Sequence, residues 1–436
     1  MKKGINAWDL TMLALGTIVG GSFFLGSAIP IKNSGPSIII AYILGGFLVY
    51  FILLALSEMT VAESLPGSFR SFAQHYLDPW MGFIVGWQYW TGMVLAMSSE
   101  AVAVSILLKE WFPEIPIIIA GGIIIILTTA VNLLGTDKLS KLESIMAAVK
   151  LLAIVGFIFI ACGLISGIFF ERQVMIHPLK DAFWAGGFMG FSGSMLIVMF
   201  TYAGFEIIGL AASEAENPHK TVPKAINSTV IILSGLYISA ISLLLFLVPY
   251  GTLSEEVSPF VAALSFQGIP WASNVMNIIL VIAILSTMFA ASFGIARMLN
   301  SLAQDGYAPK WIKDKNDIPS KCIIYSGAAI LLAFLSSFIL PKKVYVFLVS
   351  SGGYSLLFAY LIICVTHYLF RKSEGCPPKG NCQLPGYPYT AIVTIVALIL
   401  IIISMPFIEG QGAGLIAGLA LTVIYSLFYL FVYKKK

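Results

Sequence analysis

The chain carries the stretch Gly16-Thr17-Ile18-Val19-Gly20-Gly21-Ser22 in the middle of its first long apolar segment, residues 8–31. Glycine weakens a helix because it loses more backbone entropy than any other residue on folding. A second apolar segment, residues 184–213, carries Gly186, Gly187, Gly190 and Gly193, followed by Tyr202-Ala203-Gly204-Phe205-Glu206. Both segments are predicted to be helices that are interrupted near their centres.

The composition around these segments is typical of a membrane protein. The 436 residues are 59% hydrophobic and 11% charged, whereas soluble domains are about 25% charged. A transmembrane helix needs about 20 apolar residues. Twelve segments satisfy this, at residues 8–31, 37–62, 82–109, 115–134, 143–169, 184–213, 225–249, 275–303, 320–340, 344–370, 389–406 and 411–433. We expect an all-α integral membrane protein in the lipid bilayer, without a basic face for nucleic acid.

The two interrupted segments are the first and the sixth, five segments apart. Interrupted helices at matching positions of two halves indicate a transporter site at the interface of two repeats. We therefore predict a 5+5 inverted repeat, with residues 1–170 as the first five helices and 184–371 as the second. Residues 372–436 then form a cytoplasmic loop and two extra helices. The alternative is that the glycines only allow close helix packing.

The basic residues predict the orientation. With both termini placed in the cytoplasm, 18 of the 25 Lys and Arg residues fall on the cytoplasmic side, 6 fall on the other, and Lys150 lies inside a segment. This asymmetry follows the positive-inside rule. We expect a multi-pass protein of the cytoplasmic membrane, as a monomer or a homodimer.

A broken helix exposes N–H groups on one half and C=O groups on the other, and these need partners in the membrane. A half-helix N-terminus favours a carboxylate, and a half-helix C-terminus favours an ammonium group. Two facing breaks therefore suit a zwitterion such as an amino acid.

Three motifs lie in order along the chain, at Gly16–Ser27, Phe200–Glu206 and Arg297–Lys310. Together they resemble the first, sixth and eighth helices of the amino acid–polyamine–organocation (APC) superfamily of transporters, and most of all the bacterial amino acid permeases. The resemblance implies amino acid uptake by alternating access, with segments 1, 2, 6 and 7 rocking against segments 3, 4, 8 and 9. It also implies a substrate site built from Thr17, Ile18, Gly20, Gly21, Ser22, Met97, Glu100, Phe200, Thr201, Ala203 and Gly204.

Within that site, the resemblance assigns the substrate carboxylate to the amides of Gly20, Gly21 and Ser22. It assigns the ammonium group to the carbonyls of Ile18, Phe200 and Ala203. The order Gly20-Gly21-Ser22 departs from the family's usual Gly-Ser/Thr-Gly, so that a side chain at Ser22 either donates to the substrate or crowds it.

Lys150 is predicted to couple transport to protons. Removal from water penalises the charged form of an amine, so that it can gain and lose a proton. By resemblance, Lys150 replaces a sodium ion beside Ser286 and Thr287. The expected coupling ion is the proton, with no metal and no other cofactor. Snorkelling of Lys150 to the interface is the alternative.

Two buried carboxylates keep more than one interpretation. Glu100 either pairs with a cationic substrate side chain or serves as a structural or proton-handling group. Glu206 resembles a gating or coupling carboxylate, and a purely structural role is the alternative.

Other functions remain open at this point. An amino acid/amine exchanger, a nutrient-sensing receptor or a channel can share such a fold. An enzyme is not expected: Gly190-Phe191-Ser192-Gly193 resembles a rhomboid-protease motif, but this needs a buried histidine partner, and the four histidines lie in loops or at a segment end. The five cysteines are expected to be free thiols.

Overall fold

The computed structural model describes residues 5–63, 65, 67–167, 183–212, 215–254, 257–314, 318–339, 342–376, 383–408 and 411–433, with side chains undescribed at 136–141, 210, 270 and 342–350. Within these residues there are helices and no strands. Nine helices of the described residues are long and apolar enough to cross a membrane, and three shorter apolar ones complete the twelve predicted segments. The predicted all-α membrane fold is confirmed.

Ten of the segments form single helices. These are α4 Ile38–Ala62, α6 Pro79–Leu108, α7 Ile117–Asn132, α8 Thr136–Ile165, α11 Pro218–Leu247, α13 Pro270–Gln304, α14 Ser320–Ile339, α15 Lys342–Glu374, α16 Tyr389–Ser404 and α17 Gln411–Val432.

The first segment is broken, as the sequence predicts. Helix α1 (Ala7–Ile18) begins at Asn6, whose side chain accepts hydrogen bonds from two amides of the first turn. Val19 and Gly20 are extended, and the chain resumes as α2 (Gly21–Phe24) and then α3 (Ala28–Ser34). The break therefore falls within the stretch Gly16–Ser22.

The sixth segment is broken as well, into α9 (Gly187–Thr201) and α10 (Ile207–Ala211). Gly204 has φ +104°, a conformation that side-chain-bearing residues rarely adopt. The interruption lies at 202–206 alone. The run from Gly186 to Gly193 instead marks the start of α9, where a Cβ on Gly186 or Gly190 would meet the Asn33 carbonyl. For Gly186 and Gly190, close packing against α3 is the explanation, whereas Gly193 packs against Ile408.

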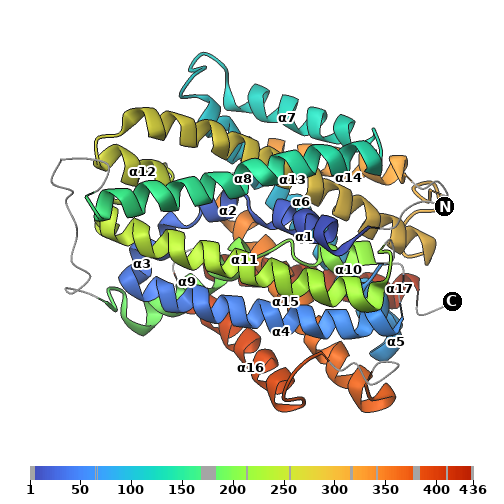
Figure 1. Cartoon of the computed structure of the whole chain (residues 1–436). Helices are drawn as coiled ribbons and strands as arrows, with labels where there is room; N and C mark the ends of the chain where they lie inside the picture. Colours follow the sequence, from blue (N-terminus) through green and yellow to red (C-terminus); the bar gives the residue numbers. More distant parts are fainter. Residues whose placement is uncertain are drawn as a thin grey trace.

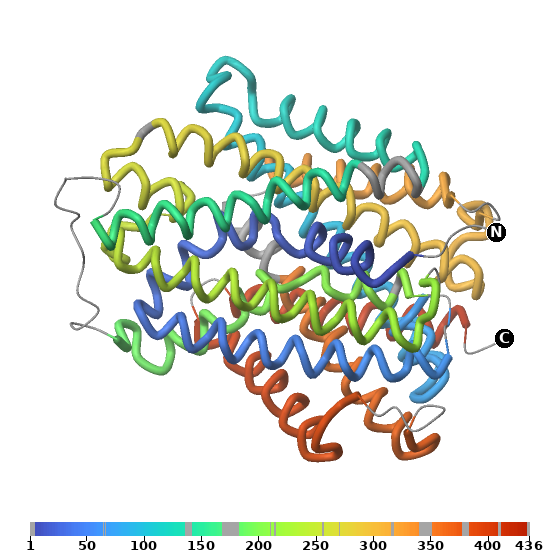
Figure 2. Tube along the Cα trace, in the orientation of Figure 1, coloured from blue at the N-terminus to red at the C-terminus, as the bar shows by residue number. Residues whose placement is uncertain are grey.

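Helix α1 lies inside the bundle, packed against α8, α11 and α13. Figure 1 shows α8, α11 and α4 side by side, and α6 packs against α13, α14 and α15 behind them. The two ends of the chain lie at the same end of the bundle (Figure 1), as an even number of crossings requires. Helix α16 lies at the periphery in the tube view (Figure 2).

Three details differ from the predicted segments. Short helices α5 (Phe69–Tyr76) and α12 (Pro259–Phe266) lie between the long ones and were not predicted. Helix α8 begins at Thr136, seven residues before the predicted start at Glu143. Glu143 consequently lies within the helix. Residue 170, the predicted end of the first repeat, lies outside the described residues, and the division into repeats stays a prediction.

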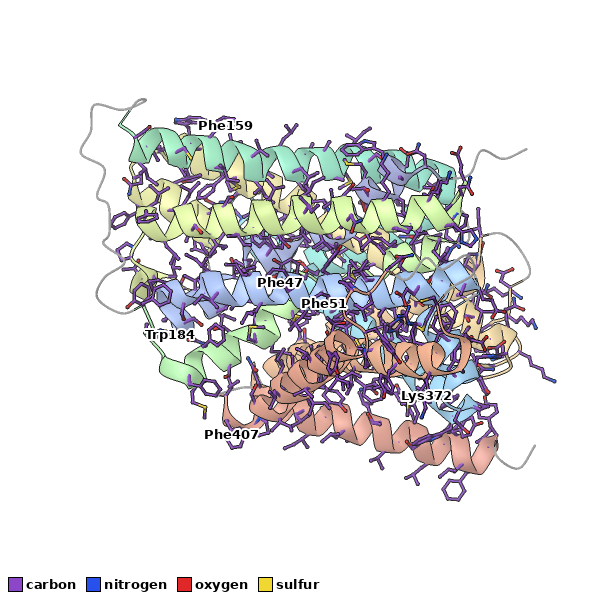
Figure 3. The ribbon with its side chains drawn as sticks, turned by 60° about the horizontal axis from the view of Figure 1, so that its bottom comes forward. Phe47, Phe51, Phe159, Trp184, Lys372 and Phe407 are labelled. Carbon is purple, nitrogen blue, oxygen red and sulfur yellow. The ribbon has the colours of Figure 1, made fainter. Side chains whose placement is uncertain are left out.

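The outer faces of the bundle are apolar. Phe159 is 68% exposed and Phe47 is 56% exposed, and Figure 3 shows Phe47 and Phe51 along the outer side of α4. Trp184 and Lys372 lie toward opposite ends of the molecule (Figure 3). Exposed apolar and aromatic side chains on the outside of a helical bundle are suited to contact with lipid.

Candidate functional site

The two breaks face each other across a small cavity. A Cβ on Gly204 would lie 3.0 Å from Cγ2 of Thr17, so the second break closely approaches the end of α1. Between them is a cavity of about 30 Å³. Its walls come from both breaks and from α6, α13 and α15.

Eight of the eleven predicted substrate residues line this cavity. They are Thr17, Ile18, Ser22, Met97, Glu100, Phe200, Ala203 and Gly204. The remaining wall comes from Met93, Ala96, Ala291 and Leu356, together with Thr287. Four of these five side chains are apolar, and Glu100 is the only acidic side chain among the residues that line the cavity.

Gly20, Gly21 and Thr201 lie just behind the wall. A Cβ on Gly20 would lie 2.5 Å from the Thr287 hydroxyl, and one on Gly21 would collide with the Glu100 carboxylate. The Thr201 hydroxyl donates to the Val198 carbonyl at 2.7 Å, within its own helix. Gly20 and Gly21 therefore allow Thr287 and Glu100 to approach the backbone of the first break closely.

The side chain of Glu100, which belongs to α6, reaches the N-terminus of α2. The Ser22 N–H donates to its carboxylate, while Oε2 has no hydrogen-bond partner among the described residues. Glu100 is 7% exposed. The carboxylate thus occupies the place where the half-helix amides favour negative charge.

Lys150 is fully buried in α8, and its Nζ donates to the Gly16 carbonyl, just before the first break. This contact excludes snorkelling to the interface. Two carboxylates, Glu143 and Glu100, interact electrostatically with the ammonium group. The lysine therefore ties α8 to the carbonyl side of the break.

Ser286 and Thr287 extend this arrangement from α13. The Ser286 hydroxyl donates to Oε2 of Glu143 at 2.7 Å. The Thr287 hydroxyl donates to the Val19 carbonyl at 3.1 Å. The predicted residues Glu100, Lys150, Ser286 and Thr287 therefore all lie around the first break.

Glu206 stabilises the second break. Its Oε1 accepts from the Tyr89 hydroxyl at 2.8 Å, and its Oε2 accepts from the Gly204 N–H at 3.1 Å and the Tyr360 hydroxyl at 3.2 Å. The side chain is 1% exposed. Glu206 thus joins the break to α6 and α15, and its coupling role stays a prediction.

A model of the amino acid permease family matches residues 9–436. The chain belongs to this family.

Relatives of the permease agree with this placement. It is 32% identical to a probable threonine/serine transporter, YbxG, of Bacillus subtilis, over 97% of this chain and 94% of the relative. It is 30% identical to the gamma-aminobutyric acid permease of the same organism, over 100% and 94%. It is also 30% identical to the aromatic amino acid transport protein AroP of Escherichia coli K12, over 100% and 96%.

The fold matches the crystal structure of MhsT in complex with L-phenylalanine. The TM-score is 0.63 at 14% identity, over 93% of this chain and 99% of that one. The family is one of transporters, which agrees with the expectation that the permease is not an enzyme.

Glu143 is the charged residue that sequence reasoning missed. It is 2% exposed, and it lies seven residues before Lys150, which places both on one face of α8. That spacing was visible, but the predicted helix began at Glu143 and left it at the membrane surface. In the structure its carboxylate lies against Gly16 of α1 and accepts from Ser286 of α13.

A second charged cluster lies at the end of the bundle where the chain termini meet. The Glu58 carboxylate accepts the N–H groups of Gln383 and Leu384, and its Oε2 lies 2.6 Å from Nε2 of His367. Arg371 donates to it at 3.3 Å. His367 is therefore engaged with α4, and no group of three His, Cys, Asp or Glu among the described residues could hold a metal.

One cysteine prediction was wrong. Cys162, Cys322 and Cys364 are free thiols, but Cys376 is disulfide-bonded. Cys382 lies outside the described residues, as does Glu214 of the loop after the sixth segment.

Proposed function

We propose that the permease imports a neutral amino acid across the cytoplasmic membrane by alternating access, as a proton-coupled symporter. The observation that carries this proposal is the meeting of the two helix breaks at one cavity, lined by Ile18 and Ser22 from the first and by Phe200 and Ala203 from the second. Amides of the first break and carbonyls of both breaks match the two charges of an α-amino acid.

The size of the cavity supports a moving site. Its volume of about 30 Å³ admits a few water molecules. An amino acid with an apolar side chain needs more room, so the walls must separate for binding. Opening toward one side at a time is alternating access.

The apolar wall supports a neutral substrate. Met93, Met97, Ala291 and Leu356 line the cavity. Glu100, the acidic residue there, already accepts the Ser22 N–H. We infer that Glu100 handles charge at the first break and does not bind a cationic substrate side chain.

Lys150 supports proton coupling. Its Nζ donates to Gly16 where the family resemblance implies a sodium ion in other members, with Ser286 and Thr287 alongside. A lysine at this place repels sodium. Protonation and deprotonation of Lys150, balanced by Glu143, then change how firmly α8 holds the first break.

The positive-inside count supports placing the end that carries both termini in the cytoplasm. The peripheral position of α16 leaves room for either a monomer or a homodimer.

The decisive experiment is uptake by the purified permease in proteoliposomes. A thermal-shift screen of the twenty amino acids first selects the substrate, since the stabilisation by a ligand grows with the logarithm of its concentration over Kd. We expect saturable uptake with counterflow, accelerated by a proton gradient directed inward. Uptake that requires substrate on the opposite side identifies an exchanger, and ion current without substrate exchange identifies a channel.

A further inference from the structure

We propose that a groove on the outer face of α11 binds the headgroup of an anionic phospholipid. The groove is shallow and open, and residues of the N-terminal half of α11 alone line it. Its lining includes Lys220, Lys224, Asn227, Ser228, Ile231 and Ile232.

The polar groups of this groove donate hydrogen bonds and carry positive charge. Lys220 and Lys224 are one turn apart on the helix and exposed, and neither forms an ion pair within the described residues. Oδ1 of Asn227 accepts from the Tyr50 hydroxyl of α4 at 2.9 Å, which leaves the amide N–H₂ available. Among the described residues, no acidic side chain lines the groove. Its charge therefore complements an anion.

The order of side chains along α11 distinguishes a lipid from a soluble anion. The lysines come first, Asn227 and Ser228 follow one turn deeper, and Ile231 lies about 10 Å beyond Lys224 at 1.5 Å per residue. Ile231 is 72% exposed. Phosphate, ester carbonyls and acyl chain follow one another in the same order in a phospholipid. Inorganic phosphate would leave the apolar end of the groove unused.

The place of the groove in the fold also fits. The N-terminal end of α11 belongs to the side that the basic residues assign to the cytoplasm, where the leaflet is rich in anionic lipid. The Thr11 hydroxyl of α1 reaches the Ala225 carbonyl of α11 at 3.4 Å, beside the groove. A lipid held there would thus anchor a helix that contacts the broken helix α1.

The test measures binding of phosphatidylglycerol to the purified full-length permease by native mass spectrometry, with phosphatidylcholine for comparison. Lys220→Gln/Lys224→Gln should bind phosphatidylglycerol roughly 30-fold more weakly, as expected for two lysines at a membrane surface. Lys310→Gln/Lys321→Gln removes the same charge from other exposed loops and helix ends and should bind like wild type. Lys220→Arg/Lys224→Arg keeps the charge and should bind phosphatidylglycerol like the wild type.

Equal phosphatidylglycerol affinity in the two Gln double variants would overturn the proposal. So would equal affinity of the wild type for the two lipids, or displacement of the bound lipid by millimolar inorganic phosphate. A second readout rests on the proposed function: uptake in phosphatidylcholine vesicles should rise when phosphatidylglycerol is added, for wild type but not for the Gln variant of the groove. Absence of any uptake, with lipid binding intact, contradicts the proposed function and not the lipid site.

Discussion

The backbone groups freed at the two helix breaks are hydrogen-bonded by different kinds of partners. At the first break, the freed backbone groups are met by side chains of three other helices: Glu100 of α6, Lys150 of α8 and Thr287 of α13. At the second break, the Gly204 amide is met by Glu206 of the same segment. Two tyrosines from neighbouring helices complete the coordination of that carboxylate.

This difference separates two roles. At the first break, a cation and two carboxylates interact, and one carboxylate oxygen lacks a hydrogen-bond partner among the described residues. A change in protonation there alters the contacts between helices. At the second break, the carboxylate has three donors, and hydrogen bonds to both of its oxygens hold it in place. We infer that the first break senses protons and that the second holds a fixed geometry.

The largest effect is expected from Lys150→Ala. Removing the buried ammonium leaves Glu143 and the Gly16 carbonyl without their cationic partner, and the contact by which protonation would hold α8 against the first break is lost. Uphill accumulation in proteoliposomes with an inward proton gradient should disappear. Lys321→Ala, at an exposed position, serves as the control and should accumulate substrate normally. Unchanged gradient-driven accumulation in Lys150→Ala would contradict proton coupling at the first break.

Gly204→Ala should have the next largest effect, at the second break. Its φ of +104° is unfavourable for alanine, and the new methyl would press on Thr17 at 3.0 Å. Such strain costs about 1–3 kcal/mol, so the thermal midpoint should fall by several degrees and substrate affinity should drop. Gly235→Ala adds the same methyl on α11, where nothing lies within 4 Å. Equal midpoints for the two variants would show that the second break is not rigid.

Glu206→Gln tests whether the second break takes part in coupling. The substitution keeps the shape but replaces one acceptor oxygen by an N–H₂ donor, which leaves at least one of the three buried donors unpaired, at a cost of about 1–3 kcal/mol. We expect the uptake rate to fall about tenfold or more, while the dependence of the rate on external pH keeps the wild-type shape. Glu100→Gln, the matched change at the first break, should alter that pH dependence. If Glu206→Gln alters it as well, the division of roles between the breaks is wrong.

The sequence predicted the breaks better than it predicted their partners. Glycines and buried charge are local features, so the stretch Gly16–Ser22, Gly204 and Lys150 were identifiable without a structure. The position of Glu100 against the Ser22 amide depends on how α6 packs beside α2, which no local pattern contains. Glu143 received no role because its partners Gly16 and Ser286 lie on other helices, and the tyrosine partners of Glu206 likewise come from helices distant in sequence.

The smallest expected effect compares one hydrogen bond at each break. Thr287→Val removes the donor to the Val19 carbonyl, and Tyr237→Phe removes the donor to the Thr201 carbonyl at 3.3 Å. Each loss should lower the free energy of unfolding by about 1 kcal/mol. A thermal-shift assay should therefore show a similar fall in the thermal midpoint for the two variants. Only Thr287 lines the cavity, so only Thr287→Val should also change the Kd for the substrate, by a few-fold. A matching change of Kd in Tyr237→Phe would mean that the carbonyls behind the second break reach the substrate as directly as those of the first.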